Sequence, residues 1–298
     1  MATLRELKGR IGSVASSEKI TGAMKMISSA KMHKAEQALR RLQPFRGQIE
    51  TIIGNLLSAD AQFTSPLLEE RPVDRIAIVV YGSDDGLCGA YNINIFKQLL
   101  SRLDFYRKEF GSEVEISVYP VGQKMYKAVR KLAADGLRGR LRVELVDGVD
   151  SKTTGDGVRG FIDMLTQAFL SKKYDRVDYL YMRFFSVSRQ RPAAEQLLPV
   201  VQSTFADNGV KSSNRPYLFE PDAATIFRSV LPMFLLAVMQ DVFTENRASE
   251  QAARVMAMQS ANDNAKKLLE QLQLEFNKLR QQSITTELLD IVGGQVRD

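Results

Sequence analysis

The sequence predicts a chain of mixed class, in which an α/β domain is inserted between two long helices that pair as an antiparallel coiled coil. Apolar residues recur with helical spacing over residues 1–60 and again over residues 222–298. Strand-like and helix-like stretches alternate over residues 73–215. Because the first helix leads into the inserted domain and the second leads out of it, both helices join the domain at the same end. They must therefore run in opposite directions.

Residues 1–60 are predicted to form the first helix. Apolar side chains follow steps of three and four residues from Leu4 to Val14, as in a coiled-coil seam. The spacing resumes around Ile27 and continues beyond Pro44, so this proline is expected to kink the helix rather than end it. Glycine is unfavourable inside a helix, and its presence predicts close approach of another backbone at Gly9, Gly12 and Gly22.

Residues 73–215 are predicted to form the central domain. The stretch RIAIVVYG at 75–82 is typical of a buried strand that ends in a glycine turn. Further strands are expected at 113–122, 141–147 and 176–187, with helices near 92–110, 122–135 and 156–172. This alternation favours a largely parallel sheet covered by helices, which is a Rossmann-like arrangement. A polar loop is expected at 205–216.

Residues 222–298 are predicted to form the second helix. Asp222 is suited to cap its N-terminus, and neither Gly nor Pro occurs between Pro232 and Gly293. Apolar positions then step by three and four residues without a break from Val255 to Leu279, as expected for a seam against one partner helix.

Small residues form a second periodic feature of this helix. Ser or Ala occurs at every fourth position, at 249, 253, 257, 261 and 265. We expect this ridge to let the N-terminal helix come close, with the glycines of that helix opposite. Asn262 lies within the apolar seam, where an Asn commonly fixes the register of two helices.

Composition and charge limit the classes of function. The chain has a formal net charge of +6, and residues 1–46 carry ten Lys or Arg against three Glu, which favours acidic partners. A single Cys excludes an internal disulfide and suits a reducing compartment. The N-terminus lacks the apolar core of a signal peptide, and the longest apolar run is broken by Pro232 and ends at Met239. We therefore expect any membrane contact to be made through another protein.

No catalytic constellation is found in the sequence. The only His is His33, so neither a Ser/His/Asp triad nor a histidine-based metal site can be built. The GxxxxGK[ST] phosphate loop is also missing. No cofactor, metal or catalytic residue is therefore expected.

The loop YGSDDGLCGAYN at 81–92 is the one candidate for a nucleotide site, since it follows a strand and opens a helix. Its glycines do not match GxGxxG, and Asp84 and Asp85 would place negative charge where a phosphate would sit. We interpret both acids as caps of the helix that follows. Cys88 is interpreted as a small buried packing residue, because no neighbouring base is in sight.

Four segments, in order, resemble those of the gamma subunit of the F-type ATP synthase, and the resemblance covers essentially the whole chain. The segments are ITGAMKMISSAKMHKAE (20–36), GSDDGLCGAYN (82–92), ASEQAARVMAMQSANDNA (248–265) and ITTELLDIVGGQVRD (284–298). The chain departs from the family pattern at Gly22, where Lys is usual, at Asp85, where Arg is usual, and at Gln295, where Ala is usual.

The resemblance implies a non-catalytic rotor shaft. Such a shaft couples proton-driven rotation of the membrane c ring to conformational changes at the catalytic sites of the beta subunits. The implied partners are the alpha and beta subunits, the epsilon subunit and the c ring. The implied location is peripheral, at the cytoplasmic face of the bacterial inner membrane, with membrane contact only through the partners.

The resemblance also implies which residues contact the beta subunits. On the N-terminal helix these are Met24 and Lys25. On the C-terminal helix they are Arg280, Gln281, Thr285 and Glu287. These residues would couple movement between subunits and would take no part in bond chemistry.

Two alternatives from other classes can be tested. The basic N-terminal helix could follow phosphates in a coiled-coil protein associated with nucleic acid, although it is poor in aromatic residues. An α/β enzyme could instead use Asp84 and Asp85 with a metal ion. The resemblance implies neither a nucleic acid partner nor such an enzyme.

Overall fold

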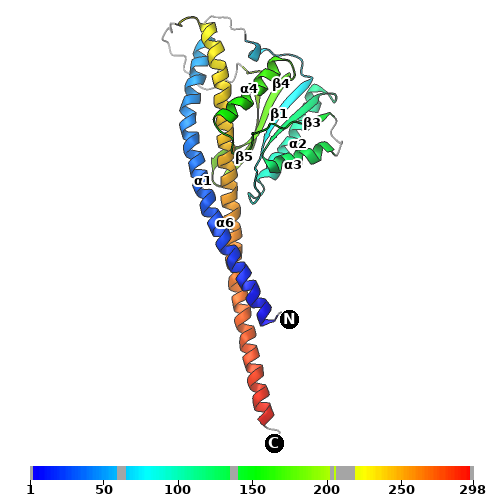
Figure 1. Ribbon diagram of the computed structural model, residues 1–298, viewed down its shortest axis with the longest axis vertical. Helices are drawn as coiled ribbons and strands as arrows, with labels where there is room; N and C mark the ends of the chain where they lie inside the picture. Colours follow the sequence, from blue (N-terminus) through cyan, green and yellow to red (C-terminus); the bar gives the residue numbers. More distant parts are fainter. Residues whose placement is uncertain (1–2, 59–64, 135–139, 202–204, 206–218, 296–298) are drawn as a thin grey trace.

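The computed structural model describes residues 3–58, 65–134, 140–201, 205 and 219–295. Two long helices lie side by side and run in opposite directions, and an α/β domain lies against one flank of the pair (Figure 1). The first helix, α1, spans Leu4–Ser58, and the last, α6, spans Ala223–Gln295. The predicted fold class is therefore confirmed. Most of the polar loop expected at 205–216 lies outside the described residues.

The two long helices differ in length. At 1.5 Å per residue, α1 with 55 residues extends about 80 Å and α6 with 73 residues about 110 Å. Pro44 lies inside α1 and Pro232 inside α6, and neither ends its helix. The excess length of α6 projects beyond the N-terminal end of α1 (Figure 1).

The seam between α1 and α6 contains the predicted apolar residues and the predicted Asn. Met258 and Leu272 are buried with exposed fractions of 4% and 7%. The side-chain amide of Asn262 donates to the carbonyl oxygen of Glu18 at 2.7 Å and to the hydroxyl of Thr21 at 3.3 Å. This polar contact across the seam is specific to one pairing of the helices, as expected for a register-fixing Asn.

The ridge of small residues faces the domain instead of α1 over its first three members, so the expected partner was wrong. The hydroxyl of Ser249 donates to the carbonyl oxygen of Met182 at 2.8 Å, and Ala253 packs against the core of the sheet. A Cβ atom built on Gly89 would lie 3.6 Å from the Cβ atom of Ala257. The ridge thus admits a strand and a loop of the domain.

The expectation that another backbone comes close to the glycines of α1 was wrong at all three positions, and only Gly22 has a near neighbour, which is a side chain. A Cβ atom on Gly22 would lie 3.4 Å from the amide nitrogen of Asn262. Among the described residues, no atom comes within 4 Å of a Cβ atom built on Gly9 or Gly12. A glycine in a helix therefore marked a close approach only where the partner presents a side chain that points across the seam.

Five strands of the described residues form one sheet, in the order β3-β2-β1-β4-β5. The strands are β1 (Arg75–Tyr81), β2 (Glu115–Val121), β3 (Leu141–Val143), β4 (Arg176–Ser186) and β5 (Arg189–Leu198). The pairs β1–β2, β1–β4 and β2–β3 are parallel, as expected, and β4–β5 is antiparallel. Strand β5 was not predicted from its polar sequence. It is an edge strand, where Pro192 is tolerated.

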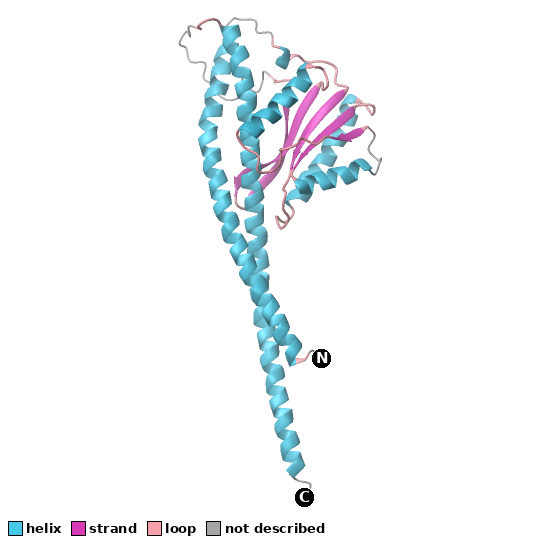
Figure 2. Cartoon of the chain, viewed as in Figure 1, coloured by secondary structure: helices cyan, strands magenta, loops and turns pink. Residues whose placement is uncertain are grey.

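Helices cover both faces of the sheet (Figure 2). On one face lie α2 (Tyr91–Phe110) and α3 (Gln123–Ala134), and on the other lie α4 (Asp156–Leu170) and the N-terminal half of α6. The C-terminal end of α1 joins the core between the sheet, α4 and α6 through Ile53 and Leu56, which are fully buried. The domain and the helix pair therefore share one continuous core.

Of the described helices, α6 is long and apolar enough to cross a membrane, with a mean hydropathy of 1.6 in its most apolar window. Of that window, 56% is buried inside the protein. Phe227, Leu231 and Leu235 of this stretch belong to the core shared with the sheet and α4. Burial within the fold accounts for the apolar character of this part of α6.

Candidate functional site: exposed faces of the helix pair

The residues expected to contact partner subunits fall on two separate stretches of the helix pair. Met24 and Lys25 lie on α1, near the level at which Asn262 of α6 bonds across the seam. The other four lie on α6, about 27 Å or more further toward its C-terminus at 1.5 Å per residue. They are Arg280, Gln281, Thr285 and Glu287. The structure therefore does not bring the two groups together.

The C-terminal group lies on the part of α6 that projects beyond α1 (Figure 1). All four of its side chains are exposed. The hydroxyl of Thr285 donates to the carbonyl oxygen of Gln281 at 2.9 Å, and that of Ser283 donates to the carboxylate of Glu287 at 3.4 Å. These bonds run within one helix, so the side chains remain available to a partner.

Exposed apolar side chains accompany the polar ones on this projecting stretch. Ile284, Leu288 and Leu289 have exposed fractions of 49%, 57% and 66%. Grouped apolar side chains in water mark an interaction surface. The sequence analysis did not single out these three residues. The available signal was that apolar residues continue beyond Leu279, where α1 has no further residues to pair with them.

Met24 and Lys25 are half-buried on α1. Three apolar side chains near them are exposed by 59%, 68% and 57% of their surface: Ile20, Met26 and Ile27. This stretch therefore combines one partly shielded cation with an apolar patch. Such a combination suits a partner that presents both an acid and an apolar side chain.

The predicted seam of α1 is displaced by one residue in this region. Ile27 was expected in the seam, but Ser28 is buried with an exposed fraction of 3%, followed by Met32 and Ala35. Because Ser28 is a small polar side chain, a search for apolar spacing does not find this buried position. Ile27 therefore lies outside the seam, and its side chain is exposed.

The basic charge of α1 is partly compensated within the protein. Arg40 pairs with Glu36 at 2.7 Å, and Arg46 pairs with Glu50 at 2.8 Å. Arg46 also reaches Asp241 of α6 at 3.4 Å. Burial opposes the charge of Arg46, but the two carboxylates raise the pKa of Arg46 above its ordinary value. Near the domain, basic residues of α1 therefore hold the helix pair together.

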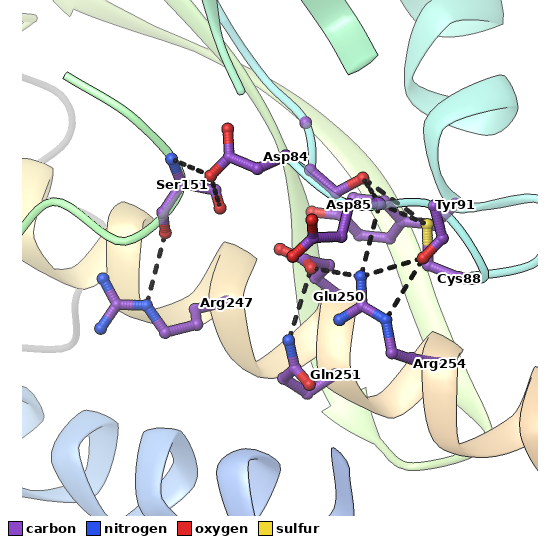
Figure 3. Close-up of polar contacts among 12 residues, drawn as sticks. Asp84, Asp85, Cys88, Tyr91, Ser151, Arg247, Glu250, Gln251 and Arg254 are labelled. Carbon is purple, nitrogen blue, oxygen red and sulfur yellow. Dashed lines mark hydrogen bonds and ion pairs between the residues drawn. The ribbon is translucent and has the colours of Figure 1, made fainter. Parts of the chain in front are cut away.

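The loop between β1 and α2 is fixed by Asp84 (Figure 3). The Asp84 carboxylate accepts from the backbone N–H of Gln123 at 3.0 Å, at the start of α3, and from the hydroxyl of Ser151 at 2.6 Å. The expectation that Asp84 and Asp85 cap α2 was therefore wrong, because α2 begins after Ala90 without a bond from a capping side chain. The loop folds back so that the carboxylate reaches the N-terminus of α3, where negative charge is favourable.

The remaining residues singled out in the sequence do not form a site for a cofactor. Asp85 pairs with the exposed Lys152 at 3.9 Å, and Cys88 is buried, as expected for a packing residue. The described residues hold no group of three or more His, Cys, Asp or Glu that could bind a metal ion. His33 is exposed and lies 3.6 Å from Glu36.

A pocket of about 330 Å³ lies between the loop 88–91, the tip of the β4–β5 hairpin and α6. It is lined by neutral side chains such as Asn94, Met182 and Gln190. A nucleotide phosphate would need a cation or a cradle of N–H groups, and this lining supplies no cation.

Comparison with known proteins identifies the family. A family model described as ATP synthase matches residues 3–296. The ATP synthase gamma chain of Bacteroides fragilis is 41% identical over 99% of this chain and 100% of its own length. That of Phocaeicola vulgatus is 40% identical over 99% of this chain and 100% of its own length. That of Stenotrophomonas maltophilia is 36% identical, with 99% of each chain covered.

Solved structures give the same fold. The rotor of the Euglena gracilis mitochondrial ATP synthase is similar with a TM-score of 0.62 at 19% identity, covering 94% of this chain and 98% of the other. The central stalk and c ring structure from Tetrahymena thermophila contains a chain with a TM-score of 0.53, covering 81% of this chain and 99% of the other. On the full-length match to bacterial relatives, the chain belongs to the ATP synthase gamma chain family.

Proposed function

We propose that this chain is the central shaft of an F-type ATP synthase. It turns inside a ring of alpha and beta subunits and couples proton-driven rotation of the membrane c ring to conformational changes at the beta-subunit catalytic sites. The single observation that carries the proposal is the 41% identity to a gamma chain over the whole length of both proteins. The helix pair with its projecting end supplies the required shape.

The chain itself performs no bond chemistry in this proposal. Its role is to present different faces to three beta subunits in turn, and the structure suits this because the helix pair is asymmetric. One helix ends early, the other projects, and the domain lies on one flank (Figure 2). Hydrolysis and synthesis of ATP belong to the assembly.

We assign the contacts to the beta subunits to both exposed stretches. Met24 and Lys25 on α1 meet an acidic segment of the partner, supported by the exposed apolar side chains near them. The projecting end of α6 contributes Arg280, Gln281, Thr285 and Glu287, with Ile284, Leu288 and Leu289 on the same stretch. Apolar contact supplies most of the binding there, since exposed ion pairs contribute only about 0–1 kcal/mol each.

The domain and the adjoining ends of α1 and α6 form the foot of the shaft. We place the epsilon subunit and the c ring there, because the opposite end of the shaft must lie inside the catalytic ring. The complex is then peripheral at the cytoplasmic face of the bacterial inner membrane. This chain touches the membrane only through its partners.

The nucleic-acid alternative is less favourable. Two basic residues of α1 already pair with carboxylates, as in Arg40–Glu36 and Arg46–Glu50. The metal-enzyme alternative is weakened because the carboxylate of Asp84 is occupied by Ser151 and by the start of α3.

Co-purification tests the proposed function. A tagged version of this chain, expressed in its own cells, should carry the alpha, beta and epsilon subunits through purification, and the complex should hydrolyse ATP. The isolated chain should bind ATP weakly or not at all by calorimetry. Recovery of the chain with nucleic acid and without those subunits would contradict the proposal.

A further inference from the structure

Helix α6 turns a row of polar side chains toward the domain, which we call the polar seam. Its members are Glu245, Asn246, Arg247, Ser249 and Arg254. Asn246 is 1% exposed, and its side-chain oxygen accepts from the hydroxyl of Tyr91 at 2.5 Å and from the backbone N–H of Met182 at 3.4 Å. Its amide donates to the carbonyl oxygen of Gly82 at 3.4 Å.

Strand β4 is the main partner of the polar seam. The parallel pairing of β1 with β4 stops at Val80 and Leu180, so the backbone of β4 is open on that side further along. The hydroxyl of Ser249 donates to the carbonyl oxygen of Met182 at 2.8 Å, and the carboxylate of Glu245 accepts from the backbone N–H of Phe184 at 3.0 Å. Side chains of α6 thus form hydrogen bonds with the backbone groups of β4 that lie beyond the end of its pairing with β1.

Two loops of the domain are held in the same way (Figure 3). Arg247 donates to the carbonyl oxygens of Ser151 at 3.4 Å and Thr153 at 3.1 Å. Arg254 donates to the carbonyl oxygen of Gly86 at 3.3 Å and pairs with the buried Glu250 at 2.8 Å. The polar seam therefore forms hydrogen bonds with one strand and two loops of the domain.

Helix α1 is placed differently. It lies on the other side of α6 from the sheet (Figure 1), and α6 reaches it through Asn262, bonded to Glu18, and Asp241, bonded to Arg46. The elements of the domain make their extensive contacts with α6. Among the described residues, helix α1 joins the core of the domain only at its C-terminal end, through Ile49, Ile53 and Leu56. A twist applied to the domain would therefore act mainly on α6 and less on α1.

We infer that the polar seam is the joint that carries twisting load between the α/β domain and the shaft, with α6 as the driven helix and α1 as its brace. This rests on the proposed function as a rotor. The hydrophobic effect is non-directional, whereas hydrogen bonds weaken steeply when their angles change. Buried polar groups that lose their partners are strongly unfavourable, so the joint resists slipping.

The test compares two asparagines of α6 in the assembled, membrane-reconstituted complex. Asn246→Leu removes the bonds to the domain, and Asn262→Leu, the matched control, removes the bond to α1. We expect Asn246→Leu to lower the torsional stiffness between domain and shaft in single-molecule measurements, and to lose proton pumping against a gradient. Unloaded ATP hydrolysis should stay unchanged. Equal stiffness loss in both variants, or none in Asn246→Leu, would overturn the inference.

A disulfide provides the rescue. A Cβ atom built on Gly89 would lie 3.6 Å from that of Ala257, within the range that a disulfide spans, and the φ of +58° at Gly89 adds backbone strain to a Cys there. The variant combines Gly89→Cys and Ala257→Cys with Asn246→Leu in a Cys88→Ser background. Its stiffness and proton pumping should recover when the disulfide is oxidised and should be lost again when the disulfide is reduced. Oxidation that restores neither stiffness nor pumping would contradict the inference that this joint carries the twisting load.

Two further results separate the possible failures. If Asn246→Leu does not fold, Tyr91→Phe removes one hydroxyl of the same joint and should give a smaller loss of stiffness. Normal stiffness in Tyr91→Phe would then count against the inference. If the unmodified chain never rotates in the complex, the proposed function fails, and the joint fails with it as a rotor element.

Discussion

At the scale of single residues, Gly22 and Asn262 set the closest contact of the two long helices. Asn262 bonds to the backbone of Glu18, one turn before Gly22, and a Cβ atom at Gly22 would come within 3.4 Å of its amide nitrogen. A methyl group at Gly22 would come into van der Waals contact with this amide. Gly22 is thus coupled to the register of the pair.

Alanine substitutions test this coupling. Gly9→Ala replaces a glycine with open space around it, and should raise the free energy of unfolding by up to about 1 kcal/mol through helix propensity. Gly22→Ala should gain less, because the crowded Asn262 offsets part of this gain. Urea unfolding of the two variants gives the comparison. An equal or larger gain for Gly22→Ala would show that the contact is not tight.

A buried carboxylate of the polar seam should make stability depend on pH. Burial raises the pKa of Glu245 above its ordinary value, although the N–H of Phe184 and the charge of Arg183 act in the opposite direction. A carboxyl with a raised folded-state pKa favours the folded state at low pH, and this contribution is lost as the pH rises through that pKa.

Glu245→Gln keeps an oxygen for the Phe184 N–H but cannot ionise. We expect the free energy of unfolding of the unmodified chain, relative to the variant, to fall between about pH 5 and about pH 8. Urea titrations at both pH values measure this difference. A difference that is constant or rises with pH would contradict the raised pKa.

At the scale of elements, α6 is the centre of the molecule because it uses two faces. One face packs on α1 through Met258 and Leu272, and the other holds the domain through the polar seam and the small residues. Ala257 belongs to the second face, against Gly89 of the loop. Each face depends on different residues, so the two can be disturbed separately.

Ala257→Leu should therefore displace the domain and leave the helix pair intact. Overpacking of this kind typically costs about 1–3 kcal/mol. Hydrogen exchange should reveal faster exchange in the loop 82–90 and in β4, with unchanged protection in the stretch of α1 around Glu18. Faster exchange centred on α1 would mean that the ridge faces that helix after all.

The sequence predicted α1, α6 and the parallel strands because long apolar periods carry that information directly. It did not predict β5, since a polar edge strand containing Pro192 has no apolar alternation. A ridge of small residues signals a near backbone without saying which one, so its partner required the structure. The exposure of the apolar residues Ile284 and Leu288 could be established only once the N-terminal end of α1 was placed, although the apolar residues beyond Leu279 are visible in the sequence.

At the scale of the whole molecule, charge and shape play different parts. Lys31 and Lys34 are exposed on α1 and Lys25 is half-buried. A few exposed ion pairs contribute about 0–1 kcal/mol each, which is little against the free energy of ATP synthesis. We infer that shape transmits the work while these lysines position the shaft in its sleeve.

Substitution of the three lysines separates the two effects. Changing Lys25, Lys31 and Lys34 to Gln should leave the torque of ATP-driven rotation largely intact and make assembly more sensitive to salt. Changing them to Glu should be more harmful, because like charges would meet in a confined space. Single-molecule torque and salt-dependent assembly decide the matter. A large fall in torque with the Gln variant would reverse the ranking.

The central claim is that this chain rotates. The most direct measurement attaches a probe to an exposed residue of α2, far from the helix pair, in a complex whose alpha and beta subunits are fixed to a surface. With ATP, the probe should turn stepwise and in one direction, and it should stop when ATP is removed. A probe that stays still while the same complex hydrolyses ATP would contradict the account.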